Sequence, residues 1–239
     1  MIGRLPESST AGERKIAHYL DTLFVSDPDT IVRYEPWVGE QRPDFLILSR
    51  RWGVMILEIK DYRADRISSV SKTGQWGLIE GDKNLFVSNP FDQLYGYSRA
   101  ILNRIQQCQF PAIVQVPVTQ IVIFPNIEFN SPPASLIYQE KPTKIHVVFN
   151  NAMITVETFQ EFLEDHGSSA VGLDGKNFDL LQYSIIPLAR LPSPIQQDLT
   201  SYLSLKEKIR LLDGEQEKIA RELGEGHRLF FGVAGSGKK

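Results

Sequence analysis

Two acidic residues and a lysine stand in a pattern that could act on a phosphodiester bond. Asp44 follows Pro43, and Glu58 and Lys60 form a Glu-x-Lys pair further along the chain. Carboxylate oxygens suit Mg²⁺ or Mn²⁺, which can polarise a phosphoryl oxygen and lower the pKa of a bound water. Lys60 could orient or deprotonate that water and stabilise developing negative charge. The residue types therefore predict metal-assisted hydrolysis.

The elements around these residues must bring the two halves of the pattern together. Residues 54–60 are expected to form a strand, in which side chains alternate between faces, so Glu58 and Lys60 share one face with Val54 and Ile56. Residues 44–48 form the preceding strand, and a glycine-containing turn joins the two as a hairpin. Such pairing would put Asp44 beside Glu58, where two carboxylates repel each other unless a cation lies between them.

Two helices add further polar candidates. Residues 11–24 have an apolar stripe at helical spacing, and Glu13 lies on the face of that stripe while completing a capping box with Thr10. A second helix is expected at residues 90–107, after Asn89. It contains the pattern Gln-x-x-x-Tyr, whose two side chains, Gln93 and Tyr97, lie one helical turn apart.

Taken as a set, these residues resemble the nuclease-related domain, NERD, a branch of the PD-(D/E)XK nuclease superfamily. The resemblance covers residues 1–166 and includes the helix with Glu13, both strands and the Asn-Pro-x-x-Gln stretch. It implies a metal site of Asp44, Glu58 and the Ile59 carbonyl. It further implies that Glu13 is a supporting carboxylate in both the metal site and catalysis. Gln93 and Tyr97 would position substrate or metal-bound water.

Each candidate also has a purely structural explanation. Glu58 and Lys60 could form a simple ion pair beside an ordinary strand start. The capping box could be the whole role of Glu13. Gln93 could bridge polar backbone groups, and Tyr97 could belong to the core.

The order of elements predicts an α/β fold with a restriction-endonuclease-like PD-(D/E)XK core, in which helices flank a mixed central sheet. Further strands are expected at residues 31–38, 75–79, 85–87, 116–124 and 145–149, and a further helix at residues 156–164. The nuclease domain is expected to span residues 1–166. A proline-containing linker at 167–194 and a second domain at 195–239 would follow.

The C-terminal stretch resembles the start of a superfamily 1 helicase. Residues 232–238 match the phosphate-binding pattern G-x-x-x-x-G-K, and residues 212–216 resemble an adenine-reading glutamine motif. The residues expected to bind ATP are Gln216, Gly232, Gly235, Gly237 and Lys238. The pattern requires Ser or Thr next, but Lys239 stands there, so we expect a truncated motor that binds ATP only when intact and does not hydrolyse it here.

The composition limits the function classes. The chain has 239 residues and a net charge of −3, and residues 1–166 carry 16 Lys and Arg against 20 Asp and Glu. Contact with DNA must therefore come from a local patch and not from a global field. A single cysteine excludes an internal disulfide, and the apolar runs are too short to cross a membrane. These features lead us to expect a cytoplasmic protein with no membrane partner.

Two functions fit this sequence. One is a Mg²⁺- or Mn²⁺-dependent deoxyribonuclease that serves a helicase in DNA repair, recombination or defence. The other is a catalytically inactive module that docks on DNA and keeps the nuclease fold. DNA is the expected partner in both cases, and a homo-oligomer is compatible with either.

Overall fold

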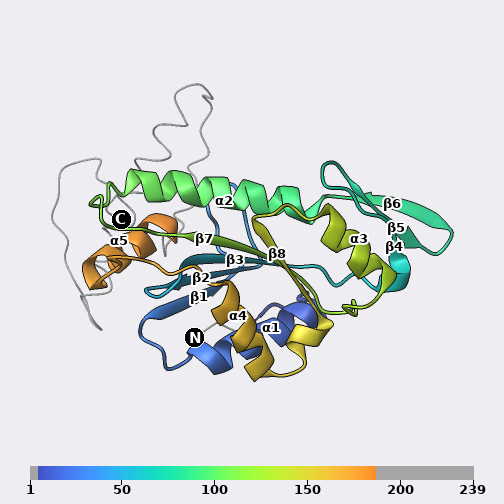
Figure 1. The fold of residues 1–239 in the computed structure, drawn as a ribbon, viewed down its shortest axis with the longest axis horizontal. Helices are drawn as coiled ribbons and strands as arrows, with labels where there is room; N and C mark the ends of the chain where they lie inside the picture. The colour runs from blue at the N-terminus through green and yellow to red at the C-terminus, as the bar shows by residue number, and fades with distance from the viewer. Residues whose placement is uncertain (1–4, 187–239) are drawn as a thin grey trace, which may run out of the picture. The chain divides into compact units, whose positions relative to one another are not determined.

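The computed structural model describes residues 5–186, in which helices and strands build one central sheet and one small sheet (Figure 1). The central sheet has the strand order β1-β2-β3-β7-β8: β1, β2 and β3 pair antiparallel, whereas β3, β7 and β8 pair parallel. The small sheet has the order β4-β5-β6. The elements are α1 Ala11–Phe24, β1 Thr30–Tyr34, β2 Phe45–Ser49, β3 Gly53–Ile59, η1 Ala64–Arg66, β4 Ile67–Ser69, β5 Trp76–Glu80, β6 Lys83–Val87, α2 Pro90–Gln107, β7 Val118–Phe124, α3 Pro132–Glu140, β8 Ile145–Phe149, η2 Asn150–Met153, α4 Val156–His166 and α5 Gly175–Ile185.

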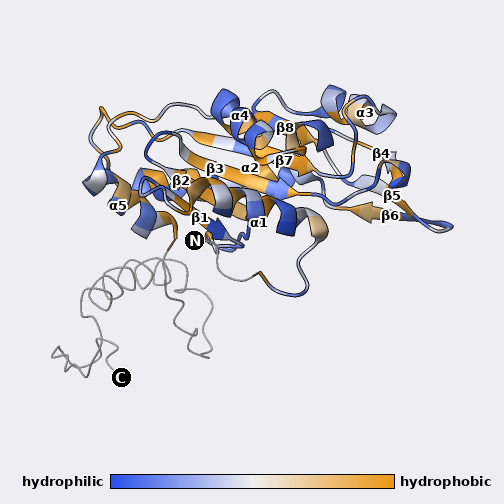
Figure 2. Ribbon diagram, turned by 90° about the horizontal axis from the view of Figure 1, so that it is seen from below, coloured by the Kyte–Doolittle hydropathy of each residue, from blue (hydrophilic) through white to orange (hydrophobic). Residues whose placement is uncertain are grey.

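The central strands are apolar on both faces because helices cover both sides of the sheet (Figure 2). Every residue of β2 and β3 is buried. Along β3, Val54 and Ile56 pack into one core with residues of α2 and α5, and Met55 and Leu57 pack into the other with residues of α1 and α4. Strand alternation therefore assigns Glu58 to the α2 side of the sheet.

The carboxyl ends of the parallel strands meet at one edge of the sheet, which is where ligands bind in open α/β sheets. At this end of the molecule lie η1, α3 and the small sheet (Figure 1). The main-chain N–H of Lys72, in the loop between β4 and β5, donates a hydrogen bond of 3.1 Å to Glu140 at the end of α3. This bond connects the small sheet to that helix. The candidate residues Glu58 and Lys60 come at this edge.

The predicted α/β architecture, a mixed central sheet between helices, is confirmed. Five elements were not predicted: η1, β4, α3, η2 and α5. The last of these lies inside the expected linker, and its residues Phe178 and Leu181 are buried against α2's side of the core. The compact unit extends through α5 because these apolar side chains complete that core, and it runs to Ile186.

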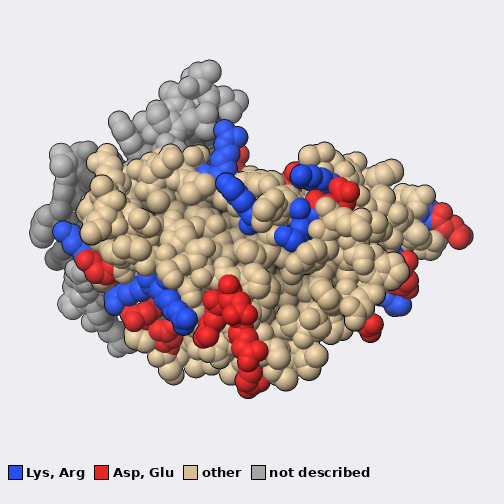
Figure 3. Space-filling model, viewed as in Figure 1, with Lys and Arg blue, Asp and Glu red and all other residues tan. Residues whose placement is uncertain are grey.

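None of the helices within residues 5–186 combines the length and the apolar character needed to cross a membrane. Charged side chains of both signs are interspersed on the face shown in Figure 3, and acidic ones gather over α4. Helix α4 contains Glu157, Glu161, Glu164 and Asp165. This face is therefore a poor surface for a polyanion, in agreement with the expectation that any DNA contact is local.

Candidate active site

Asp44 and Glu58 come together through the β2–β3 hairpin. The antiparallel register pairs Phe45 with Leu57, so one step further it sets Asp44 opposite Glu58. Asp44 is held there by its Oδ2 atom, which accepts a hydrogen bond of 2.6 Å from the main-chain N–H of Ile59. The prediction that the hairpin would place the two acids side by side is confirmed.

Lys60 turns back onto Glu58. Its Nζ atom lies 2.6 Å from Glu58 Oε1, and the two side chains are only 16% and 3% exposed. The other oxygen, Oε2, is buried and has no hydrogen-bond partner among residues 5–186. The Tyr97 hydroxyl also interacts with the Glu58 carboxylate, but Oε2 makes no hydrogen bond of good geometry, so Glu58 is open to a further ligand.

The electrostatics of the site follow from two acids sharing a buried space. Burial and the neighbouring Glu58 charge raise the pKa of Asp44 to about 7, against the opposing effects of the Ile59 N–H and Lys60. For Lys60, burial alone would lower the pKa, but the Glu58 carboxylate reverses that effect and raises it. Lys60 is therefore an ammonium ion at neutral pH, and one positive charge faces two acidic groups.

Helix α2 brings its polar candidates to the same face. Its start is fixed by Asn89, whose side chain accepts from the N–H of Phe91 (2.9 Å) and donates to Ser71 (3.0 Å). Tyr97 is 6% exposed, and burial together with the Glu58 and Asp44 charges raises its pKa. Gln93, one turn earlier, has a buried Oε1 atom without a hydrogen-bond partner in the described part of the chain.

Glu13 makes its hydrogen bonds with groups other than Asp44 and Glu58. Helix α1 packs on the opposite face of the sheet from Glu58, and Glu13 completes the capping box with Thr10. Its Oε2 atom also accepts a hydrogen bond of 2.9 Å from the Tyr34 hydroxyl. Glu13 reaches the site only through its charge, which makes a small contribution to the raised pKa of Asp44. The expected metal ligand is thus engaged by its own helix and by β1.

Two residues directly after Lys60 were missed by the sequence reasoning. Asp61 Oδ2 accepts from the N–H of Gly12 in α1 (2.9 Å), and its Oδ1 from the side-chain amide of Asn126 after β7 (3.3 Å). Tyr62 is partly buried, and its pKa is raised by burial, lowered by Lys60 and raised by Glu58. Their position directly after the Glu-x-Lys pair could have indicated them, because residues at the carboxyl ends of strands form the ligand sites of open α/β sheets.

The donor set fits a divalent cation only in part. Two carboxylates stand together, one with an unpaired buried oxygen, and oxygen donors are what Mg²⁺ and Mn²⁺ take. Among the residues that the structure describes, however, no three His, Cys, Asp or Glu side chains are grouped to hold a metal ion. A main-chain donor such as the Ile59 carbonyl, together with water, would have to complete the coordination.

The expected ATP site and second domain, with Gln216, Gly232, Gly235, Gly237 and Lys238, lie outside the described residues. Comparison with curated proteins and with solved structures gave no match. A family match covers residues 8–125 and carries the description NERD, nuclease-related domain. This range contains all the candidate residues of the acidic site, from Glu13 to Tyr97. The chain therefore carries a nuclease-related domain at residues 8–125.

Proposed function

We propose that this domain hydrolyses phosphodiester bonds of DNA with Mg²⁺ or Mn²⁺ held by Asp44, Glu58 and the Ile59 carbonyl. The observation that carries the proposal is the half-satisfied Glu58 carboxylate, buried between Asp44 and Lys60 in a nuclease-related domain. The cation would polarise the phosphodiester and acidify a water.

Lys60 has the role of a fixed positive charge. Its ammonium group is held by Glu58 at 2.6 Å and stays protonated, so it can donate to a phosphoryl oxygen or orient the attacking water. Tyr97 is close enough to feel the Glu58 and Asp44 charges, and Gln93, one turn earlier on α2, has a buried oxygen without a partner among residues 5–186. These side chains would position the scissile phosphate and its water.

Cleavage of linear and circular DNA with Mn²⁺ tests this proposal. Lys60→Ala should lower the rate about 10²–10³-fold, the usual loss when a transition-state donor is removed. Lys72→Ala serves as the matched control, because Lys72 contacts Glu140 of α3 through its main-chain N–H, which the substitution keeps. A wild-type chain that leaves every DNA intact, or cleavage unchanged by Lys60→Ala, would overturn the proposal.

One observation favours the alternative, a catalytically inactive module that docks on DNA. Within residues 5–186 no third acidic or histidine side chain joins Asp44 and Glu58, and Glu13 is bound elsewhere. DNA binding that persists in Asp44→Asn, together with no cleavage by the wild-type chain, would select this alternative.

Our proposal includes a cytoplasmic setting and work beside an ATP-driven helicase in repair, recombination or defence. Its support is the phosphate-binding pattern at residues 232–238 and the glutamine motif before it. Nucleotide binding by the intact nuclease-helicase that is lost in Lys238→Ala would support the motor assignment, and binding unchanged by that substitution would count against it.

A further inference from the structure

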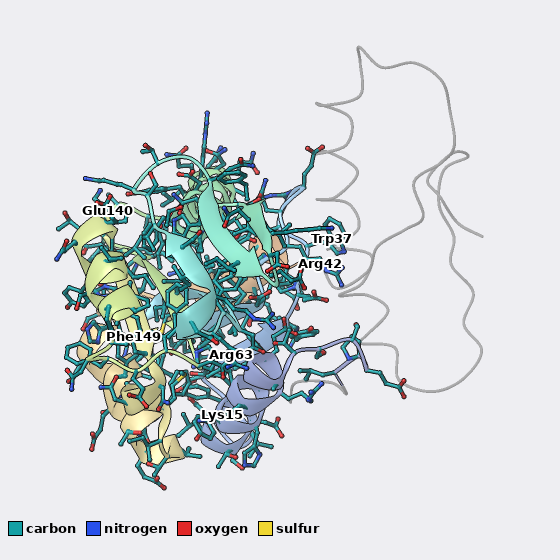
Figure 4. The ribbon with its side chains drawn as sticks, turned by 90° about the vertical axis from the view of Figure 1, so that its right-hand side faces the viewer. Lys15, Trp37, Arg42, Arg63, Glu140 and Phe149 are labelled. Carbon is teal, nitrogen blue, oxygen red and sulfur yellow. The ribbon has the colours of Figure 1, made fainter. Side chains whose placement is uncertain are left out.

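A pocket opens beside the candidate active site, between the segment that follows Lys60 and the small sheet. Its lining includes Tyr62, Arg63 and Arg66 from that segment, and Leu78, Ile79 and Leu85 from β5 and β6. Figure 4 looks at this end of the molecule and places Arg63 between helix α1 and the small sheet. Tyr62 stands two residues after Lys60, so the pocket adjoins the site in the chain and in space.

The walls of the pocket are apolar and firmly held. Leu78 and Leu85 are cross-strand partners in the β5–β6 ladder. The ring of Tyr62 packs on Phe124 of β7, with ring centroids 6.5 Å apart. Ile79 and Leu85 remain 39% and 40% exposed, although each would be more stable in contact with another apolar group. The pocket therefore offers a flat apolar body a place to pack.

Two arginines of the lining, Arg63 and Arg66, could contact a phosphate. Arg66 makes no ion pair with any residue between 5 and 186, and the Arg63–Asp65 pair is about two-thirds exposed on both sides and therefore weak. The lining also holds two acids: Asp61, which accepts hydrogen bonds from Gly12 and Asn126, and Glu80, whose cross-strand partner is Lys83. An incoming phosphate would meet two available guanidinium groups.

We propose that this pocket takes an unstacked base of single-stranded DNA next to the scissile phosphate, an inference that rests on the proposed nuclease function. A base can stack on an aromatic ring such as that of Tyr62 without its identity being read, because every base has a π face. A base in an intact duplex would first have to leave its stack, at a cost of a few kcal/mol. The domain should therefore prefer single strands or unpaired ends.

Binding measured without metal separates this inference from cleavage. The full chain is titrated in EDTA against a fluorescein-labelled oligothymidylate and against a blunt duplex, with binding followed by anisotropy. The wild-type chain should bind the single strand about tenfold more tightly. Leu85→Asn should weaken single-strand binding about five- to tenfold and leave duplex binding unchanged, because apolar contact area for the base is lost. Arg66→Ala should also weaken it and reduce its salt dependence.

The same strand provides a matched control. Phe86 follows Leu85, does not line the pocket and is 69% exposed, so Phe86→Asn should stay within twofold of the wild-type affinity. Equal affinity for single strand and duplex, or an equal loss in Phe86→Asn and Leu85→Asn, would overturn the pocket assignment. Lys60→Ala without effect on cleavage would instead overturn the nuclease proposal, so the two failures are distinguishable.

Discussion

At the scale of single residues, the charged groups of the site lower the stability of the folded protein. Glu58 is 2% exposed, and Lys60 neutralises only one of its oxygens, while the neighbouring Asp44 is kept in place by the Ile59 N–H. Two acids and one ammonium ion leave a net negative charge in a confined space. Buried titratable groups whose pKa values are shifted by their neighbours are concentrated at functional sites.

Removing one acid should therefore stabilise the metal-free protein. The folded-state pKa of Asp44 is raised to about 7 from the ordinary 3.8, so ionised Asp44 destabilises the fold above pH 7, and this cost disappears as the pH falls from 7 towards 4. Asp44→Asn keeps an acceptor for the Ile59 N–H. In EDTA at pH 8 we expect its Tm to rise by about 3 °C, on the order of 1 kcal/mol for a domain of this size.

Calorimetry at two pH values provides the control for that experiment. The gain in Tm should shrink at pH 5, where Asp44 is largely protonated in the wild-type protein. Adding Mn²⁺ at pH 8 should stabilise the wild-type protein and not the variant. A variant that melts below the wild-type protein at pH 8 would show that the acid pair is not under repulsion.

The sequence was most informative about these residues. Asp44, Glu58 and Lys60 were found from their types and their alternation along strands, and the structure brings them together as expected. The position of Glu13 could not be derived in the same way. A helical stripe says which face is apolar, but not which side of the sheet that face covers, and α1 covers the side away from Glu58.

At the scale of elements, the first turn of α1 is pressed against the strand ends of the site. A Cβ atom on Gly12 would stand 2.4 Å from Asp61 Oδ1 and 2.6 Å from Cγ of Pro125. The approach allows the Gly12 N–H to bind Asp61, and Asp61 is the residue after Lys60. Glycine is required here because of space and not because of its backbone angles.

Gly12→Ala should therefore destabilise the protein, although alanine favours helices. We expect a loss of about 1–3 kcal/mol from overpacking, together with slower cleavage, because Asp61 must move. Gly96→Ala in α2 is the control: the added methyl group meets only the flexible side chain of Gln41, at 3.3 Å, so helix propensity should make that change neutral or stabilising. Urea unfolding measures both, and equal effects would refute the steric explanation.

Helix limits were predictable where caps were present. The bounds of α1 and α2 match the prediction because Thr10 with Glu13 and Asn89 with Pro90 define their starts. Helix α3 begins with two prolines and has a weak apolar stripe, so the sequence did not reveal it. Contacts between residues far apart in the sequence could not be predicted either. The ring centroids of His146 on β8 and His166 on α4 lie 4.6 Å apart, although the two residues share no sequence motif.

At the scale of the whole molecule, the compact unit is longer than the predicted nuclease domain. It runs to Ile186 because α5 completes the α2 side of the core with Phe178, Leu181 and Ile185. Prolines at 187, 192 and 194 suggested a boundary, but the loosened pattern from residue 167 hid the short helix α5.

Truncation tests this boundary. A chain of residues 1–186 should be folded, melt cooperatively and keep the cleavage rate of the full chain, since the acidic site and both cores lie within it. A chain ending at residue 166 should lose several kcal/mol and aggregate, because removing α5 uncovers apolar surface. Equal melting temperatures of the two fragments would show that α5 contributes nothing to the core.

The most direct test of the central claim is a calorimetric titration of the full chain with Mn²⁺. If Asp44 and Glu58 share one cation, the wild-type protein should bind a single Mn²⁺, Asp44→Asn and Glu58→Gln should each abolish that binding, and Glu13→Gln should leave it nearly unchanged. Binding that survives in both Asp44→Asn and Glu58→Gln, or that is lost only in Glu13→Gln, would contradict the account.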